Sequence, residues 1–461
     1  MAFYWGTAAT IVKERRTGHR DGTRERSFLW KPRTCEWQVS RHMVIPRRFA
    51  SIAAVLAAFL IVLAGQSGAG AAPPAPDSPS RQYLVTGATT AQQRTQLART
   101  GAAIDNVRAD GSVEVSAIPA EVGAIKRLGL KVSLLPAPGP APRAATSYHT
   151  YAETLAEIDQ VVANYPQIAR KFVAGKSYQG RDIVGVKISD NVNADEAEPE
   201  VLYIANIHAR ERLTNEQALY LIGILTKEYN ATSRITNIVN TREIWIIPIS
   251  NPDGQVYDMT SDTSPGRMWR KNRRGSGIDL NRNFAYRWGC CGGSSGNTAS
   301  ETYRGPSAES EPETKALANF TRSRVVGGVQ QLKIFLDIHS YGELVLWPFG
   351  YTYADTVPGA LSADEEATHR TIGRQMASSN RYTPQQSSDL YITDGTTDDW
   401  FWGNQRIFSY TFEMYGSSFY PSPSIIERET SRNREALLTL TEYADCPYRA
   451  IGKQQQYCGT P

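Results

Sequence analysis

Two short apolar runs, each ending at a histidine, constrain the fold of this chain more than any other feature. Residues 201–207 lead into His208, and residues 332–338 lead into His339. Short runs rich in apolar and β-branched residues are typical of buried strands. Open α/β sheets place their ligands at the carboxyl ends of such strands. The two histidines are therefore expected to meet at one edge of a sheet.

A third residue completes a set of metal ligands. Glu211 follows His208 by three positions, and His339 comes 128 residues after Glu211. A lone His-x-x-Glu is a weak signal, but histidine is scarce here, with six in 461 residues. Two His and one Glu leave the fourth position of tetrahedral zinc to water, as in catalytic sites. We predict one zinc ion held by His208, Glu211 and His339.

Helix and strand patterns alternate from about residue 144 onward. Strands are expected at 182–188, 201–207, 242–249, 332–338 and 406–413, and helices at 154–164, 215–229, 424–443 and from Pro312. This alternation predicts an α/β domain over residues 144–445, with a mixed central sheet flanked by helices.

The N-terminal region differs in charge from the rest of the chain. Residues 1–48 carry 11 Lys and Arg against 4 Asp and Glu, so the formal net charge of +4 leaves the remainder near −3. The chain after residue 48 therefore lacks the net positive charge that would indicate nucleic-acid binding.

An export signal is expected just after this basic region. Arg47 and Arg48 precede an apolar stretch over 49–64, and a small-residue cleavage pattern ends at Ala71. This order is typical of secretory signals. We predict a signal peptide at 43–71, a secreted product, and an over-extended N-terminus at 1–42. A short membrane anchor is the alternative, although the run is short for a membrane span.

A small α+β unit is expected between two Pro-rich linkers at 73–80 and 136–143. Its strand and helix patterns run from Gln82 to Leu135, and the second linker ends at Arg143. A compact unit between linkers that ends at a basic residue indicates a removable pro-segment, here 72–143. An independent accessory domain is the alternative.

Four cysteines remain once the leader with Cys35 is removed, an even number that fits an oxidising compartment. They allow three connectivities. We favour Cys446–Cys458, which leaves Cys290–Cys291 as a vicinal pair, and cross-pairing stays open. The tail over 446–461 has no role that the sequence indicates.

The motifs between residues 145 and 445 resemble those of zinc carboxypeptidases of the carboxypeptidase A/B type, nearest to the bacterial carboxypeptidase T branch. They are His208-Ala-Arg-Glu211, Asn251-Pro-Asp-Gly254, Arg267 to Arg273, Asp279-Leu-Asn-Arg-Asn-Phe284, Tyr303-Arg-Gly305, Ser310-Glu-Pro-Glu-Thr314, His339-Ser-Tyr341, Tyr391, Asp399-Trp400 and Thr411-Phe-Glu413. All occur in the family's order. A His2Glu zinc site is itself known from carboxypeptidase A, so the link from these ligands to that activity comes with the resemblance.

The resemblance implies a role for each remaining residue. Zinc would activate a water molecule, and Glu413 would be the general base that takes its proton. Arg270 would stabilise the oxyanion, unless it is a solvated surface arginine.

Substrate recognition is implied for a second group of residues. Arg282, with Asn281 beside it, would bind the free C-terminal carboxylate. Arg210 is also placed among the substrate-binding residues. Tyr391 would close over the bound residue, with a packing aromatic as the alternative.

A preference for side chains is expected from Asp398. In the family this position distinguishes apolar from basic substrates, and an Asp there favours Lys or Arg, with tolerance for apolar residues. The neighbouring Asp394 and Asp399 are alternatives for this position. Some relatives bind calcium, but no calcium ligands are assigned.

Two other functions compete with this prediction. One is a zinc-dependent cell-wall peptide amidase, and the other is a non-catalytic peptide-binding relative. The expected partners are peptide or protein C-termini and the chain's own pro-segment as a blocker of the cleft. Nucleic acid and stable membrane insertion are not expected.

Overall fold

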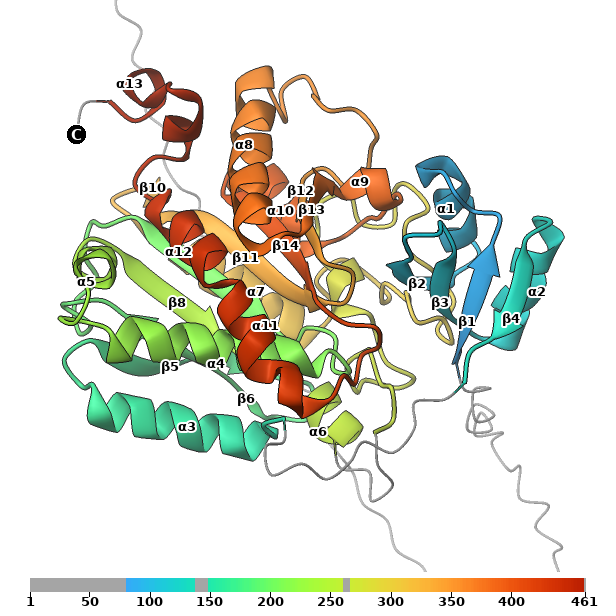
Figure 1. Ribbon diagram of the computed structural model, residues 1–461, viewed down its shortest axis with the longest axis horizontal. Helices are drawn as coiled ribbons and strands as arrows, with labels where there is room; N and C mark the ends of the chain where they lie inside the picture. Colours follow the sequence, from blue (N-terminus) through green and yellow to red (C-terminus); the bar gives the residue numbers. More distant parts are fainter. Residues whose placement is uncertain (1–79, 137–147, 260–265, 460–461) are drawn as a thin grey trace, which may run out of the picture. The chain divides into compact units, whose positions relative to one another are not determined.

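The computed structural model describes residues 80–136, 148–259 and 266–459. Its first part is a small α+β unit of the order βαββαβ (Figure 1). The elements are β1 (Arg81–Thr86), α1 (Ala91–Ala98), β2 (Ala103–Val107), β3 (Val113–Ala117), α2 (Pro119–Arg127) and β4 (Lys131–Leu134). The sheet order is β2-β3-β1-β4, and each neighbouring pair is antiparallel.

An eight-stranded mixed sheet forms the centre of the larger part, in the order β13-β12-β14-β11-β7-β8-β6-β5. These strands are β5 (Ala169–Lys176), β6 (Asp182–Ile188), β7 (Glu200–Ala205), β8 (Glu243–Ile247), β11 (Leu332–Ser340), β12 (Leu344–Trp347), β13 (Thr383–Gln386) and β14 (Phe408–Met414). The four central strands, β14, β11, β7 and β8, are parallel. A separate hairpin joins β9 (Val325–Val326) and β10 (Val329–Gln330).

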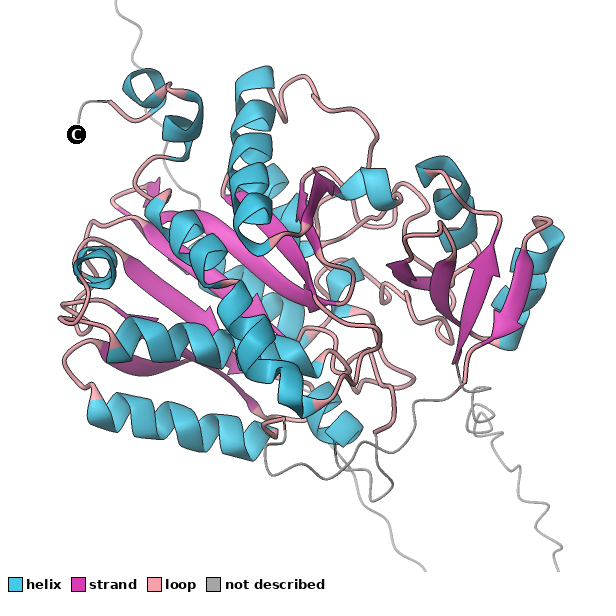
Figure 2. Cartoon of the chain, in the orientation of Figure 1, coloured by secondary structure: helices cyan, strands magenta, loops and turns pink. Residues whose placement is uncertain are grey.

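Helices cover both faces of this sheet (Figure 2). They are α3 (Tyr151–Asn164), α4 (Arg212–Lys227), α5 (Ser233–Val239), α6 (Pro252–Met259), α7 (Pro312–Ser323), α8 (Ala363–Asn380), α9 (Ser387–Leu390), α10 (Thr397–Gln405), α11 (Ile426–Arg432), α12 (Arg434–Glu442) and α13 (Gln454–Tyr457). Short 3-10 turns add η1 (Leu280–Arg282), η2 (Pro423–Ile425) and η3 (Pro447–Ile451).

The central strands are apolar on both faces because each face packs against a separate core. On β7, Val201 and Tyr203 join the core that includes α4, whereas Leu202 and Ile204 join the core that includes α7 and α10. Side chains alternate between the faces of a strand, so a strand buried on both sides has a continuous apolar sequence. The predicted mixed α/β fold is confirmed.

The register of the parallel strands gathers the predicted metal ligands. His208 follows the end of β7, and His339 is the last residue but one of β11, which pairs with both β7 and β14. In this register His339 lies opposite Glu413. Residues from three distant parts of the sequence thus meet at one sheet edge.

Both favoured disulfides, Cys290–Cys291 and Cys446–Cys458, are present. The predicted signal peptide, the over-extended N-terminus and Arg143 lie outside the described residues. Within the described ranges, no helix combines the length and apolar character needed to span a membrane.

Candidate active site

The three predicted metal donors lie together and are buried. The ligand atoms of His208, Glu211 and His339 are all within 4.8 Å of one another. The two Nδ1 atoms are 3.1 Å apart, and each is within 3.0 Å of a different carboxylate oxygen of Glu211. Two nitrogens bound to one tetrahedral zinc at about 2.0–2.1 Å would lie about 3.3 Å apart. The spacing therefore suits one zinc ion.

Two buried aspartates orient the histidine rings. His208 Nε2 is 3.0 Å from Asp279, and His339 Nε2 is 2.9 Å from Asp337. A carboxylate only accepts hydrogen bonds, so each Nε2 donates, and the Nδ1 of each ring faces inward, where its lone pair can bind a metal that displaces the proton. Two lone pairs and a carboxylate then face one point, which is the arrangement that a cation satisfies.

The electric field at this point favours positive charge. Burial alone would lower the pKa of His339, but Asp337 and Glu211 raise it well above its ordinary value. Burial would raise the pKa of Glu211, yet His208 and His339 hold it below its usual range. The donor set therefore fits a divalent metal both in chemistry and in charge.

Glu413 lines the same cavity as the three donors. Loss of water around this partly buried carboxylate raises its pKa to about 8, while His339 and Arg270 act in the opposite direction. A dication bound beside Glu413 would add to the effect of His339 and Arg270 and bring the pKa back toward its ordinary value. A carboxylate in this position is placed to exchange protons with a group held next to the metal.

Arg270 is fixed beside the donors by hydrogen bonds to Asp279. Its Nε and Nη2 donate to Asp279 at 3.2 and 2.9 Å, and its Nη1 lies 3.9 Å from Glu211. The side chain is buried and lines the cavity. The surface alternative for Arg270 is thus incompatible with its burial.

Arg282 is a buried cation held by neutral oxygens. It donates from Nε to the Gly293 carbonyl at 3.1 Å and from Nη1 to the Asn281 carbonyl at 2.7 Å, and its Nη2 lies 3.5 Å from the Tyr391 hydroxyl. Among the residues that the structure describes, no carboxylate forms an ion pair with it. Its guanidinium therefore has no direct carboxylate partner among the described residues.

The structure distinguishes the three neighbouring aspartates. Asp398 lines the cavity and accepts hydrogen bonds from the Ser387 hydroxyl at 2.7 Å and from the Asp399 amide at 2.9 Å. Asp399 accepts from the backbone of residues 350 and 351, and Asp394 accepts from the loop after Cys290. Asp398 alone of the three has access to the cavity.

Arg210 is the one predicted site residue that does not line this cavity. Its Nη2 donates to Asp105 at 2.7 Å and its Nη1 to Ser116 at 2.8 Å, and both partners belong to the small N-terminal unit. Ile104 and Asp105 of that unit line the cavity instead. In this state of the chain Arg210 is occupied by the N-terminal unit.

Asn281 and Tyr391 also line the cavity. The side chain of Asn281 lies 3.3 Å from His339 Nε2 and accepts a hydrogen bond from the Thr397 amide at 2.8 Å. Both predicted positions are thus at the site, but the amide oxygen of Asn281 already accepts a hydrogen bond from within the protein.

The two aspartates that orient the histidines were not predicted from the sequence. Asp337 precedes His339 by two positions on one strand, so the two share a face of the sheet. Asp279 lies in the same motif as Asn281 and Arg282. The spacing of two residues was the signal that could have identified Asp337.

The fold and the site together define a class of metal-dependent hydrolases with an α/β fold and a buried His2Glu donor set. Residues 154–436 match the model of the family described as zinc carboxypeptidase. The chain is 43% identical over 436 residues to "Zinc carboxypeptidase" of Saccharothrix mutabilis subsp. capreolus, covering 88% of this chain and 99% of that protein. It is 31% identical over 331 residues to human "Carboxypeptidase B2", covering 69% and 75%.

A solved structure is similar over most of the chain. The carboxypeptidase A of Helicoverpa armigera superposes with a TM-score of 0.65 at 25% identity, covering 82% of this chain and 99% of that one. The chain belongs to the zinc carboxypeptidase family. It is a metallocarboxypeptidase, a hydrolase that acts at the C-termini of peptides.

Proposed function

We propose that this protein binds one zinc ion through His208, Glu211 and His339 and removes the last residue of peptides that end in a free carboxylate. The observation that carries the second part is Arg282, a buried guanidinium without a carboxylate partner among the described residues. Arginine binds a carboxylate through two parallel hydrogen bonds. An endopeptidase with the same metal donors has no need of such a group.

The chemistry is divided among the residues around the cavity. Zinc held by His208, Glu211 and His339 would act as a Lewis acid, which polarises a carbonyl and lowers the pKa of a water molecule. Glu413 accepts the proton of the attacking water as the oxygen adds to the carbonyl carbon, and it passes that proton to the leaving nitrogen when the C–N bond breaks. Arg270 stabilises the negative charge on the former carbonyl oxygen.

Hydrolysis of paired peptides by the processed protein tests this proposal. Each peptide ends in a free Lys, Arg, Leu or Glu, and its twin carries a C-terminal amide. We expect release from the free acids only, loss of activity with a chelator, and recovery with zinc. Equal cleavage of the amidated twins would contradict the exopeptidase assignment.

Asp398 is proposed to select basic C-terminal residues. Its carboxylate is buried in the cavity wall and has hydrogen bonds, but no cation pairs with it among the described residues. A buried carboxylate is costly without such a partner. The side chain of a substrate Lys or Arg would supply the charge, and apolar side chains would still bind less well.

Replacing Asp398 by Ile is expected to abolish cleavage of C-terminal Lys and Arg while leucine is still released. Asp398→Asn keeps the shape and removes the charge, so the Lys/Leu ratio of kcat/KM should fall by about 30-fold or more, the size expected for a buried charge pair. Release of leucine by the same variants serves as the control. An unchanged ratio in both variants would refute the assignment.

The small N-terminal unit, within residues 72–143, is proposed to be a pro-segment that blocks the cavity until it is cleaved near Arg143. Three kinds of contact support this. Asp105 pairs with Arg210 at 2.7 Å, and Tyr341 donates to Glu114. Arg94 donates to the Leu390 carbonyl at 2.6 Å, directly before Tyr391.

The uncleaved zymogen with Asp105→Asn is expected to show increased peptidase activity. Both members of the Asp105–Arg210 pair are buried, and breaking such a pair costs about 3–5 kcal/mol. Hydrolysis of a short peptide by the uncleaved chain should therefore rise by at least about tenfold. Asp110→Asn, on an exposed turn of the same unit, is the matched control. Equal activity of zymogen and processed enzyme would contradict the blocking role.

A signal peptide at 43–71 and secretion of the product complete the proposal. N-terminal sequencing of the exported protein would test both, because a cleaved signal leaves a new terminus near Ala71.

A further inference from the structure

The loop that carries the Cys290–Cys291 disulfide contacts the arginine that is proposed to bind the substrate. We call residues 290–294 the cysteine loop. Its Gly293 carbonyl accepts a hydrogen bond from Arg282 Nε at 3.1 Å. Arg282 is 3% exposed, so this carbonyl is one of few groups that set the rotation of its guanidinium. The position of the loop, together with the Asn281 carbonyl that accepts from Nη1, thus determines where the guanidinium points.

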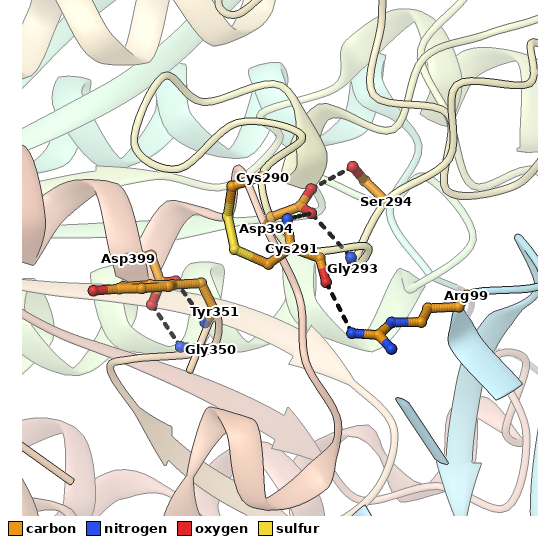
Figure 3. The surroundings of a disulfide bond; sticks show 9 residues. All are labelled: Arg99, Cys290, Cys291, Gly293, Ser294, Gly350, Tyr351, Asp394 and Asp399. Atoms are coloured by element: carbon orange, nitrogen blue, oxygen red, sulfur yellow. Dashed lines mark hydrogen bonds between the residues drawn. A yellow bond between two sulfur atoms is a disulfide. The ribbon is translucent and has the colours of Figure 1, made fainter. Parts of the chain in front are cut away.

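Asp394 accepts hydrogen bonds from three residues of the cysteine loop (Figure 3). One oxygen of its carboxylate accepts from the backbone amides of Cys291 at 3.1 Å and Gly293 at 2.9 Å. The other oxygen accepts from the Ser294 hydroxyl. Asp394 is fully buried, and no Lys, Arg or His pairs with it among the described residues. Hydrogen bonds to an ionised group are stronger than neutral ones, so these three fix the loop firmly.

Close packing leaves the loop little freedom to shift. A Cβ on Gly293 would lie 2.3 Å from the backbone of Thr393, next to Asp394. Gly395, with a φ of +66°, lies against the backbone of Arg282, where a Cβ would come within 2.5 Å of its carbonyl oxygen. The segment 393–395 therefore touches both the cysteine loop and the arginine that the loop orients.

Orientation by carbonyls has a chemical consequence. A carboxylate partner would orient Arg282 but would also neutralise it and compete with the substrate. Neutral carbonyls direct the guanidinium and leave its charge for a carboxylate that arrives later. The carboxylate that anchors the arrangement, Asp394, bonds to the loop rather than to the arginine.

We propose that Asp394 is a positioning residue for recognition of the terminal carboxylate: it holds the cysteine loop so that the Gly293 carbonyl orients Arg282. This inference rests on the proposed role of Arg282 as the carboxylate anchor. A displacement of about 1 Å in a substrate-binding group can reduce catalysis strongly. The effect here belongs mainly to substrate binding, because the metal donors and Glu413 are held by other contacts.

The test compares Asp394→Ala with Asp394→Asn in the processed enzyme. In Asp394→Ala we expect KM for a free-carboxyl peptide to rise about tenfold, with kcat within about twofold. The inhibition constant of a carboxylate-bearing competitor should rise by a similar factor, and that of acetohydroxamate, which binds the metal without a carboxylate, should stay unchanged. Asp394→Asn should restore most of the affinity, because its amide can still accept from the two backbone amides and donate to Ser294.

Two further variants guard against a folding defect. Gly293→Ala displaces the same carbonyl while keeping the Asp394 carboxylate and should give the same rise in KM. Asp389→Ala, an exposed aspartate five positions earlier, should behave as wild type. Unchanged KM in both Asp394→Ala and Gly293→Ala, or an equal loss of acetohydroxamate binding, would overturn the inference.

Failure of the proposed function gives a different result. If Arg282→Gln keeps full discrimination between acid and amide peptides, the anchor itself is assigned wrongly. If Arg282→Gln loses this discrimination while Asp394→Ala and Gly293→Ala retain wild-type KM, only the positioning role of Asp394 is wrong.

Discussion

Replacing Glu413 by Gln is expected to reduce kcat for peptide hydrolysis by about 10³-fold or more, within the range that general acid–base catalysis contributes. Glutamine has nearly the same shape but cannot accept the proton of the attacking water. Glu413 lines the cavity but is not one of the three proposed zinc ligands, so the variant should keep its zinc. Steady-state hydrolysis of a free-acid peptide measures the first effect, and metal analysis of the purified protein measures the second.

The control for this variant is Glu427→Gln, which changes an exposed carboxylate on α11. We expect wild-type rates from it. An active Glu413→Gln enzyme would exclude Glu413 as the base. Loss of zinc together with loss of activity would instead give Glu413 a role in holding the metal.

Removal of Arg282 should have the second large effect. In Arg282→Gln the buried cation is lost, and a charged hydrogen-bonded pair with the substrate carboxylate is lost with it. We expect kcat/KM for free-acid peptides to fall by about 10²–10³-fold, since truncating one partner of such a pair costs about 2–5 kcal/mol. Activity on amidated twins should stay at its low level, so the preference for acids should collapse.

Arg282→Lys separates charge from geometry. Lysine keeps the charge but lacks the planar fork, so an intermediate loss is expected. Arg287→Gln, an exposed arginine five positions later, is the matched control. Retention of the acid preference in Arg282→Gln would exclude this residue as the anchor.

Much of the fold could be predicted because each central strand has a continuous apolar sequence. The strand expected at 182–188 is β6 with the same bounds, and the run 332–338 is β11, which extends two residues further to Ser340. The two strands at one end of the sheet, β12 and the edge strand β13, were not predicted. They have four residues each, and Pro384 lies within β13, so their sequences lack a clear pattern.

The helix expected at 424–443 is a second instructive difference. The structure divides it into η2, α11 and α12, with Asn433 between the last two. The side chain of Asn433 bonds to Gln217 on α4 and accepts from Asn380 on α8. Contacts from two other helices thus fix a break that the apolar period of the segment does not reveal.

The order of the motifs predicted a His2Glu metal site, because the types of residue and their spacing indicate the chemistry even before the structure is known. His208 and His339 each come at the end of an apolar run, and Glu211 lies three positions after His208. Both features are visible in the sequence. Which groups share a cavity depends on strand register and side-chain direction, which are set by packing between distant segments. Only the tertiary structure therefore separated Asp398 from Asp394 and Asp399, directed Arg210 toward Asp105, and placed the cysteine loop against Arg282.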